Sequence, residues 1–114
     1  MAYNKLNLVA SSAGALLTNI NHANRVNQTY QALVCVSGTF GGGTATLAVS
    51  PDGGTTLITL KDKLGSAISL TANGYANIEI AGYSNNNTKP LQVYAVLTGA
   101  TSPNLNFTVF DNMG

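Results

Sequence analysis

Charged side chains are scarce in this chain of 114 residues. Lys, Arg, Asp and Glu together make up 8% of it and leave a formal net charge of +1, whereas a typical soluble domain has about 25% charged residues. No basic stripe is present to bind nucleic acid, and no acidic tail to repel it. Asn, Thr, Ser and Gly supply the polarity. Because few ion pairs exist for salt to screen, we expect a stability that changes little with ionic strength.

Residue types that carry catalytic or metal chemistry are equally scarce. One cysteine excludes an intramolecular disulfide, and one cysteine with one histidine does not make a zinc site. Carboxylates spread over separate loops and strands fit neither a calcium loop nor a glycosidase pair, and a catalytic triad would depend on a histidine in an Asn-rich link. We therefore expect a protein that is not an enzyme and holds no cofactor or metal. The residues concerned are Cys35, His22, Asp52, Asp62, Glu79 and Asp111.

Long apolar runs and helical periodicity are also missing. No stretch reaches the roughly 20 apolar residues of a transmembrane helix. Residues 8–17 are interrupted by polar residues and follow a single Lys, so we predict no signal peptide. Short β-rich runs alternate with Gly, Asn and Pro turns, and 45% of the chain is hydrophobic. This pattern predicts an all-β fold, an antiparallel β-sandwich or jelly roll of about seven to nine short strands.

The N-terminal quarter has the weakest pattern. Residues 6–9 could form a short strand, residues 15–20 could form another strand or one helical turn, and several asparagines follow them. Asn favours turns and caps over the interior of strands. We therefore predict an N-terminal arm and irregular link over residues 1–28, and a single β-sandwich domain over residues 29–114.

Residues 44–60 predict a hairpin around Ser50-Pro51-Asp52-Gly53-Gly54. A four-residue loop would place Leu47 opposite Ile58 and Ala45 opposite Leu60, with threonines on the other face. The motif S-x-D-x-G-x-T in this stretch resembles the Asp-box, which in sialidases and related β-propellers is a hairpin device remote from the active site. We interpret it here as turn chemistry.

Alternation predicts the faces of the remaining strands. A second hairpin is expected around Asn73-Gly74, with Gly74 in a left-handed bulge and Glu79 outward. We expect a central strand over residues 30–37 that is covered on both sides, which would bury Cys35 as an inert thiol. The inward sets of the last two strands are Leu91, Val93, Ala95 and Leu97, and then Leu105, Phe107 and Val109.

Two sets of outward residues are candidates for function. Apolar side chains that point away from the core usually mark contacts with partners. The candidate interface residues are Leu57, Glu79, Val96 and Phe110. The polar segment 82–90 is the most exposed loop, and its candidate residues for binding sugar are Tyr83, Asn85, Asn86 and Asn87, with Tyr75 and Tyr94 as further aromatics.

Two stretches carry a resemblance to a known class of proteins. The run V-S-G-T-F-G-G-G-T-A-T-L-A-V-S-P-D-G-G-T-T at residues 36–56 and the run L-Q-V-Y-A-V-L-T-G-A-T-S-P at residues 91–103 resemble phrases of small virion structural proteins of tailed bacteriophages. The chain departs from those phrases at Leu57, where Trp is usual, and at Gly43, where Ala is common. The resemblance covers about half of the chain, residues 36–60 and 91–105.

The resemblance implies a non-enzymatic β-sandwich, a capsid decoration (cement) protein or a head-fibre component. Such proteins are commonly homotrimers that bind the major capsid protein and stabilise the phage head, so the expected location is the virion, assembled in the host cytoplasm. The partners implied are copies of the chain and the capsid protein, with neither nucleic acid nor membrane. The alternative is a carbohydrate-binding or fibre/adhesin β-sandwich module.

Overall fold

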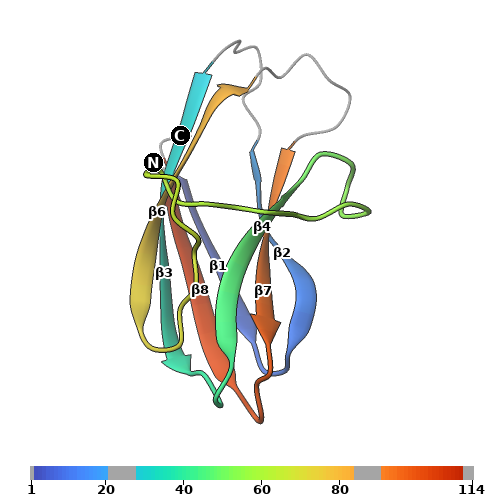
Figure 1. Ribbon diagram of the computed structural model, residues 1–114, viewed down its shortest axis with the longest axis vertical. Helices are drawn as coiled ribbons and strands as arrows, with labels where there is room; N and C mark the ends of the chain where they lie inside the picture. The colour runs from blue at the N-terminus through green and yellow to red at the C-terminus, as the bar shows by residue number, and fades with distance from the viewer. Residues whose placement is uncertain (1, 21–27, 84–90, 112–114) are drawn as a thin grey trace.

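The chain forms two antiparallel sheets and, within the described residues, no helix. The computed structural model describes residues 2–20, 28–83 and 91–111. Its strands are drawn in Figure 1. They are β1 (Ala2–Leu8), β2 (Ser12–Ile20), β3 (Gln28–Thr39), β4 (Thr44–Ser50), β5 (Ile58–Thr59), β6 (Gly74–Tyr83), β7 (Leu91–Thr98) and β8 (Asn104–Asp111).

The strand order is that of a jelly roll. One four-stranded sheet, called sheet A below, has the order β1-β8-β3-β6, and the other, sheet B, has the order β2-β7-β4-β5. The first strand pairs with the last, the second with the seventh, and so on inward to β4 and β5, as if one long hairpin were wound around a barrel. Two packed sheets with eight strands in this winding are the jelly-roll architecture. The prediction of an all-β antiparallel sandwich is confirmed.

The core lies between the inner faces of the two sheets. Phe107, Leu105 and Val34 of sheet A and Leu47 and Leu97 of sheet B are almost completely buried. They lie at every second position of their strands, which is the pattern expected when one face of an antiparallel sheet is buried. The predicted inward sets of β7 and β8 are confirmed, since Val93, Ala95, Leu97, Leu105, Phe107 and Val109 are buried and Leu91 packs against them.

The N-terminal segment is part of the sandwich, which corrects the prediction of an arm over residues 1–28. β1 pairs with β8 along its whole length, from Ala2↔Asp111 to Leu8↔Leu105, and β2 pairs with β7. Register shifts interrupt β2 between Ser12 and Ala15 and between Leu16 and Thr18. Those bulges disturb the alternation that identifies a strand, because two residues then oppose one. The predicted irregular link, with His22, lies outside the described residues.

The first hairpin forms with a longer loop than predicted. Val49 pairs with Ile58 and Ala48 with Thr59, and the amide of Leu60 donates to the carbonyl of Leu47 at 3.0 Å. The register is therefore displaced by two residues from the predicted one. Side chains of the loop itself cause the displacement, as described below. A displacement of two keeps every residue on its predicted side, so Leu60 still packs into the core, whereas Ile58 is left exposed at the end of the strand.

The second predicted hairpin, around Asn73 and Gly74, is wrong. β6 pairs instead with β3, from Gln28↔Tyr83 to Val36↔Gly74, and Gly74 is not among the residues with positive φ. The segment before it crosses to sheet B, where Leu70 exchanges two backbone hydrogen bonds with Ala45, at 2.8 and 2.9 Å. Long-range pairing replaces the local hairpin because it buries the apolar residues of both segments, including Ile68 and Ile78, in one core.

Three turns are joined at one end of the sandwich. The turns that follow β1, β3 and β7 lie together at the bottom of Figure 1. The amide of Thr101 donates to the carbonyl of Gly41 at 2.9 Å, and the amide of Ala100 donates to the hydroxyl of Ser11 at 3.0 Å. A Cβ at Gly41 would lie 2.3 Å from the carbonyl oxygen of Thr101. Glycine is needed there because the two turns approach too closely for a side chain.

Candidate functional site

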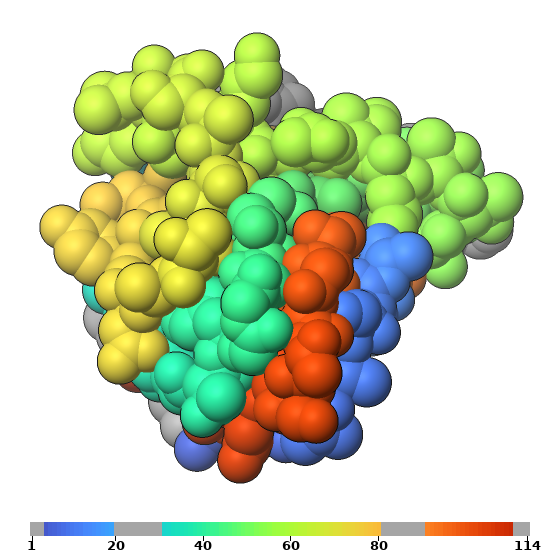
Figure 2. Space-filling model, turned by 60° about the horizontal axis from the view of Figure 1, so that its bottom comes forward, coloured from blue at the N-terminus to red at the C-terminus, as the bar shows by residue number. Residues whose placement is uncertain are grey.

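The outer face of sheet B is a broad surface with a partly apolar centre. Figure 2 shows β4, β7 and β2 side by side on this face, with the segment after β4 along one end of it. The predicted outward residues Leu57 and Val96 both lie here, Leu57 with 37% of its surface exposed and Val96 half-buried. Val96 is flanked by Thr46 in the neighbouring strand. Leu16 adds a further exposed apolar side chain, and it pairs with Tyr94.

The loop between β4 and β5 folds over this same face. The Cδ1 atom of Leu57 lies 2.6 Å from the position that a Cβ on Gly14 would occupy, and the hydroxyl of Tyr94 lies 2.5 Å from that position on Gly54. The hydroxyl of Tyr94 also donates to Gln92 at 2.9 Å. Tyr94 is therefore held under the loop and is not an exposed aromatic for sugar binding.

Asp52 and Ser50 hold the loop closed. The Asp52 carboxylate accepts hydrogen bonds from the amide of Thr56 at 2.8 Å and from the Ser50 hydroxyl at 3.0 Å. The Ser50 oxygen in turn accepts the amide of Gly54 at 2.8 Å. Donation from the Thr56 amide, then from its side chain, lowers the pKa of Asp52 from its ordinary value and outweighs the opposing effect of burial, because hydrogen bonds to the ionised form favour it. The interpretation of S-x-D-x-G-x-T as turn chemistry is confirmed.

The outer face of sheet A carries the other two candidate interface residues. Phe110 is half-buried and pairs with Leu33, which is also half-buried. Glu79 is exposed and accepts a hydrogen bond from the Gln31 side chain at 3.2 Å. Polar side chains border the apolar centre: the Asn7 amide donates to Asn104 and to Asn106, at 2.9 Å each. The predicted outward direction of Glu79 and Phe110 is confirmed.

Cys35 also lies on this outer face rather than in the core. It is a free thiol, half-buried, and it pairs with Thr108 on one side and Tyr75 on the other. The prediction of a strand covered on both sides is corrected: β3 is central in its sheet, but only its inner face is fully covered. Apolar residues on the outer side of a central strand suggested a second covering layer that the described part of the chain does not supply.

The four candidate residues therefore form two separate surfaces. Leu57 and Val96 lie on the outer face of sheet B, and Glu79 and Phe110 lie on the outer face of sheet A. The two faces point in opposite directions across the sandwich, so one partner surface cannot contact all four at once.

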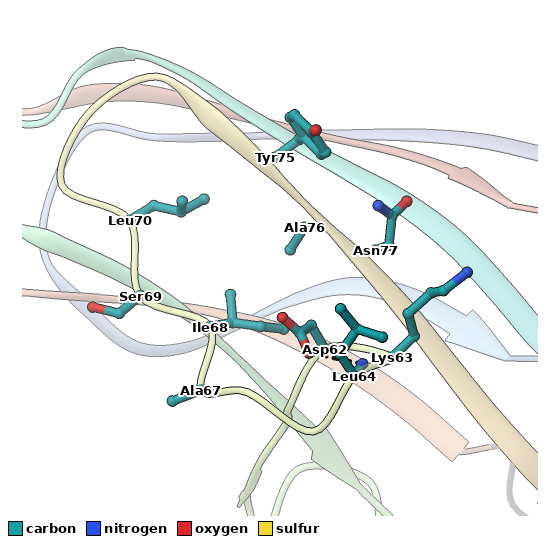
Figure 3. Close-up of a pocket in the computed structure, with 10 residues that line it drawn as sticks. All are labelled: Asp62, Lys63, Leu64, Ala67, Ile68, Ser69, Leu70, Tyr75, Ala76 and Asn77. Carbon is teal, nitrogen blue, oxygen red and sulfur yellow. Dashed lines mark hydrogen bonds between the residues drawn. The ribbon is translucent and has the colours of Figure 1, made fainter.

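A pocket of about 340 Å³ opens at the edge of sheet A. Figure 3 shows its two walls, the strand β6 on one side and the segment 62–70 on the other. Ile68, Leu70 and Ala76 supply its apolar part, and Asp62, Lys63, Tyr75 and Asn77 supply polar groups. The amide of Lys63 donates to the carbonyl of Asn77 at 2.9 Å and closes one end. Tyr75 is 65% exposed. Sequence reasoning named Tyr75 as a possible sugar-binding aromatic but not this pocket, because the second hairpin was paired wrongly.

Most of the predicted exposed loop, residues 84–90, lies outside the described residues. Tyr83 ends β6, where its backbone pairs with Gln28, but its side chain and Asn85, Asn86 and Asn87 lie outside the described residues. Within the described ranges, no group of three or more His, Cys, Asp or Glu side chains is arranged to hold a metal ion. Nor does that part of the chain contain a helix long and apolar enough to cross a membrane.

Comparison of the chain with protein families, with curated proteins and with solved structures finds no match.

Proposed function

We propose that this protein is a non-enzymatic virion structural protein, a capsid decoration (cement) protein that binds and stabilises the head of a tailed bacteriophage. The observation that carries the proposal is the pair of opposite outward faces, each with a partly apolar centre and a neutral, hydrogen-bonding border. Apolar groups left half-exposed on a small domain are typical of contact surfaces. A cement protein has to hold two neighbours at once, and two such faces on opposite sides of one rigid sandwich suit that task.

The jelly roll and the sequence resemblance support the same class. Jelly rolls build viral capsid domains, although they also build lectins and cupins, so the fold alone does not select a function. The two stretches that resemble phage virion proteins lie next to each other: β4 and β7 are paired from Thr44↔Thr98 to Ser50↔Gln92. The resemblance therefore concerns one contiguous part of the sandwich.

We assign contact between copies to the sheet B face and contact with the major capsid protein to the sheet A face. Val9 in the turn before β2 and Leu16 in β2 are exposed apolar residues at one edge of sheet B, and the Leu57 side chain reaches over to Gly14 at this edge. Ile58 is exposed in β5 at the opposite edge. Closure of a homotrimer requires two patches whose outward directions differ by about 60°, whereas opposite faces would give an open stack. A face together with its adjoining edge meets this requirement, and the sheet B face has apolar residues at both edges.

The test combines light scattering behind a sizing column with binding to capsids that lack the protein. Val96→Lys is expected to dissociate the trimer, because an ammonium would be placed in a dry contact. Phe110→Lys is expected to keep the trimer and to weaken capsid binding by more than about tenfold. Thr71→Lys is the matched control, an exposed position outside both faces, and should change neither measurement.

Two results would refute the proposal. Failure of the wild-type protein to bind capsids that lack it would remove the cement function. A monomer at high concentration, with capsid binding intact and unaffected by Val96→Lys, would remove the assignment of the sheet B face to contacts between copies.

A further inference from the structure

We propose that the pocket between β6 and the segment 62–70 binds a neutral saccharide unit. This inference does not depend on the proposed function, since the pocket contains none of the four candidate interface residues. Its volume of about 340 Å³ lies at the lower end of the range for small-molecule sites, and a single sugar ring with part of its neighbour is a ligand of that size.

Two polar side chains of the pocket, those of Asn77 and Tyr75, have no hydrogen-bond partner within the described part of the chain. Elsewhere on the surface, long polar side chains bond to each other, as Gln92 does to Asn19 at 2.8 Å. In the pocket, the amide of Asn77 and the hydroxyl of Tyr75 make no such bond. Asp62 uses one oxygen, which accepts the amides of Leu64 and Ser66 at 2.9 Å each, and leaves the other for a ligand. Amide and carboxylate groups of this kind are donors and acceptors for vicinal hydroxyl groups.

The backbone of β6 adds further groups. In an antiparallel ladder, alternate residues direct both N–H and C=O toward one side. The carbonyl of Asn77 points away from β3, because it accepts the amide of Lys63 at 2.9 Å. Tyr75 is two residues earlier in the same strand, so its N–H and C=O also point outward, toward the segment that forms the other wall. A ligand in the pocket therefore meets an unpaired stretch of sheet edge.

The apolar groups and the charges indicate which ligand fits. Figure 3 shows Tyr75 and Asn77 on the same side of β6, with Lys63 extended beside Asn77, and Ile68 and Leu70 on the opposite wall. A sugar ring has C–H faces that pack on aromatic and aliphatic surfaces while its hydroxyls bond at the rim. Asp62 and Lys63 carry opposite charges that cancel, which favours a neutral ligand over a phosphate or a carboxylate.

An extended peptide fits the same edge less well. The Lys63–Asn77 bond closes one end of the pocket, and the turn before Gly74 closes the other, so the open edge spans only Tyr75 to Asn77. An added strand advances about 3.3 Å per residue and usually pairs over about five residues. The edge between these limits is too short for that pairing, whereas a compact ring needs only two or three bonds.

The experiment is a titration of the ¹⁵N-labelled full chain, followed by amide chemical shifts. The probes are the methyl glycosides of D-glucose, D-galactose, D-mannose, L-rhamnose and N-acetyl-D-glucosamine, each up to about 50 mM, because a ligand of this size is expected to have a millimolar dissociation constant. At least one should shift the amides of residues 62–70 and 74–77 in a saturable way. Tyr75→Ala and Asn77→Ala should each weaken that binding about tenfold or more.

Glu79→Ala is the matched control. It lies on the same outer side of β6 as Tyr75 and Asn77 but outside the pocket, and it should leave the affinity unchanged. Absence of saturable shifts with all five glycosides overturns the proposal, and so does an unchanged affinity in both pocket variants. Saturable shifts at the same amides with a blocked Val-Thr-Val-Thr peptide, and with no glycoside, would also overturn it and indicate strand addition.

Discussion

Alanine substitution at the two neighbouring glycines 41 and 42 provides a sharp test of the packing at the joined turns. Both residues have positive φ, +62° and +76°, but a Cβ at Gly41 would lie 2.3 Å from the Thr101 carbonyl oxygen, whereas a Cβ at Gly42 has no heavy atom within 4 Å. Gly42→Ala therefore carries only the backbone cost of about 1–2 kcal/mol. A gain of about 0.4–1 kcal/mol from the stiffer unfolded chain partly offsets it.

Gly41→Ala has to separate the two turns as well. Forcing a methyl group into this contact costs about 1–3 kcal/mol. It also breaks the bond from the Thr101 amide to the Gly41 carbonyl, 2.9 Å long, which contributes about 1 kcal/mol. The expected loss of unfolding free energy is therefore about 2–4 kcal/mol larger than for Gly42→Ala. For a chain of this length that difference corresponds to about 8–16 °C in melting temperature.

Urea denaturation followed by circular dichroism, with a thermal melt of the same samples, measures both values. Equal losses for the two variants would refute the reasoning, because they would show that the turns do not approach as closely as Gly41 and Thr101 require. A larger loss for Gly42→Ala would refute it more strongly.

Three further outcomes follow from the same structure. The pKa of Asp52 is lower in the folded protein than in the unfolded chain, so the contribution of its carboxylate to the free energy of unfolding is present above the unfolded pKa of about 3.9 and is lost as pH falls through the folded pKa. Below about pH 4, the urea midpoint should therefore fall less in Asp52→Asn than in the wild type. Parallel curves of midpoint against pH for the two proteins would contradict this. Phe107→Ala should cost about 3–5 kcal/mol of unfolding free energy, because Phe107 is fully buried. Phe110→Ala, on the outer side of the same strand, should cost about 1 kcal/mol. Similar denaturation midpoints for the two variants would be inconsistent with the two side chains lying on opposite faces of β8. With only 8% charged residues, melting temperature should move by less than about 2 °C between about 0.02 and 0.5 M NaCl, and a larger rise would reveal repulsion between charges that salt screens.

The faces of the strands were predictable because they depend on local alternation alone. Val93, Ala95 and Leu97 alternate with Gln92, Tyr94, Val96 and Thr98, and each of the three lies on the side that the alternation predicts. The class of fold followed from the same signal and from the spacing of the turns. Pairing between strands was harder, because a register displaced by two residues satisfies the alternation equally well. The loop held by Ser50 and Asp52 selected such a register.

Pairing between distant strands was not predictable from local pattern. Ile68 and Ile78 would lie on one face in a local hairpin, and they also lie in one core when β6 pairs with β3. The local pattern favours the hairpin because its loop is short, whereas in the structure β6 pairs with β3, a central strand of sheet A. In the N-terminal segment, the bulges of β2 removed the periodicity on which strand prediction depends. The pocket was missed for the same reason, since it exists only where the segment 62–70 crosses beside β6.

Several residues of the stretches that carry the sequence resemblance serve the fold rather than a contact. Gly41 permits the approach of two turns, Asp52 closes the loop over sheet B, and Phe40 and Pro103 are buried. Substitutions at these positions would lower stability and reduce any binding indirectly. A measurement of function has to change outward residues that leave the core intact, such as Val96, for which a stable fold and a lost contact can be distinguished. The sheet B face is separate from the pocket, and the pocket adjoins the sheet A face but does not include Phe110, so substitutions at Val96, Phe110 and Asn77 test the three regions one at a time.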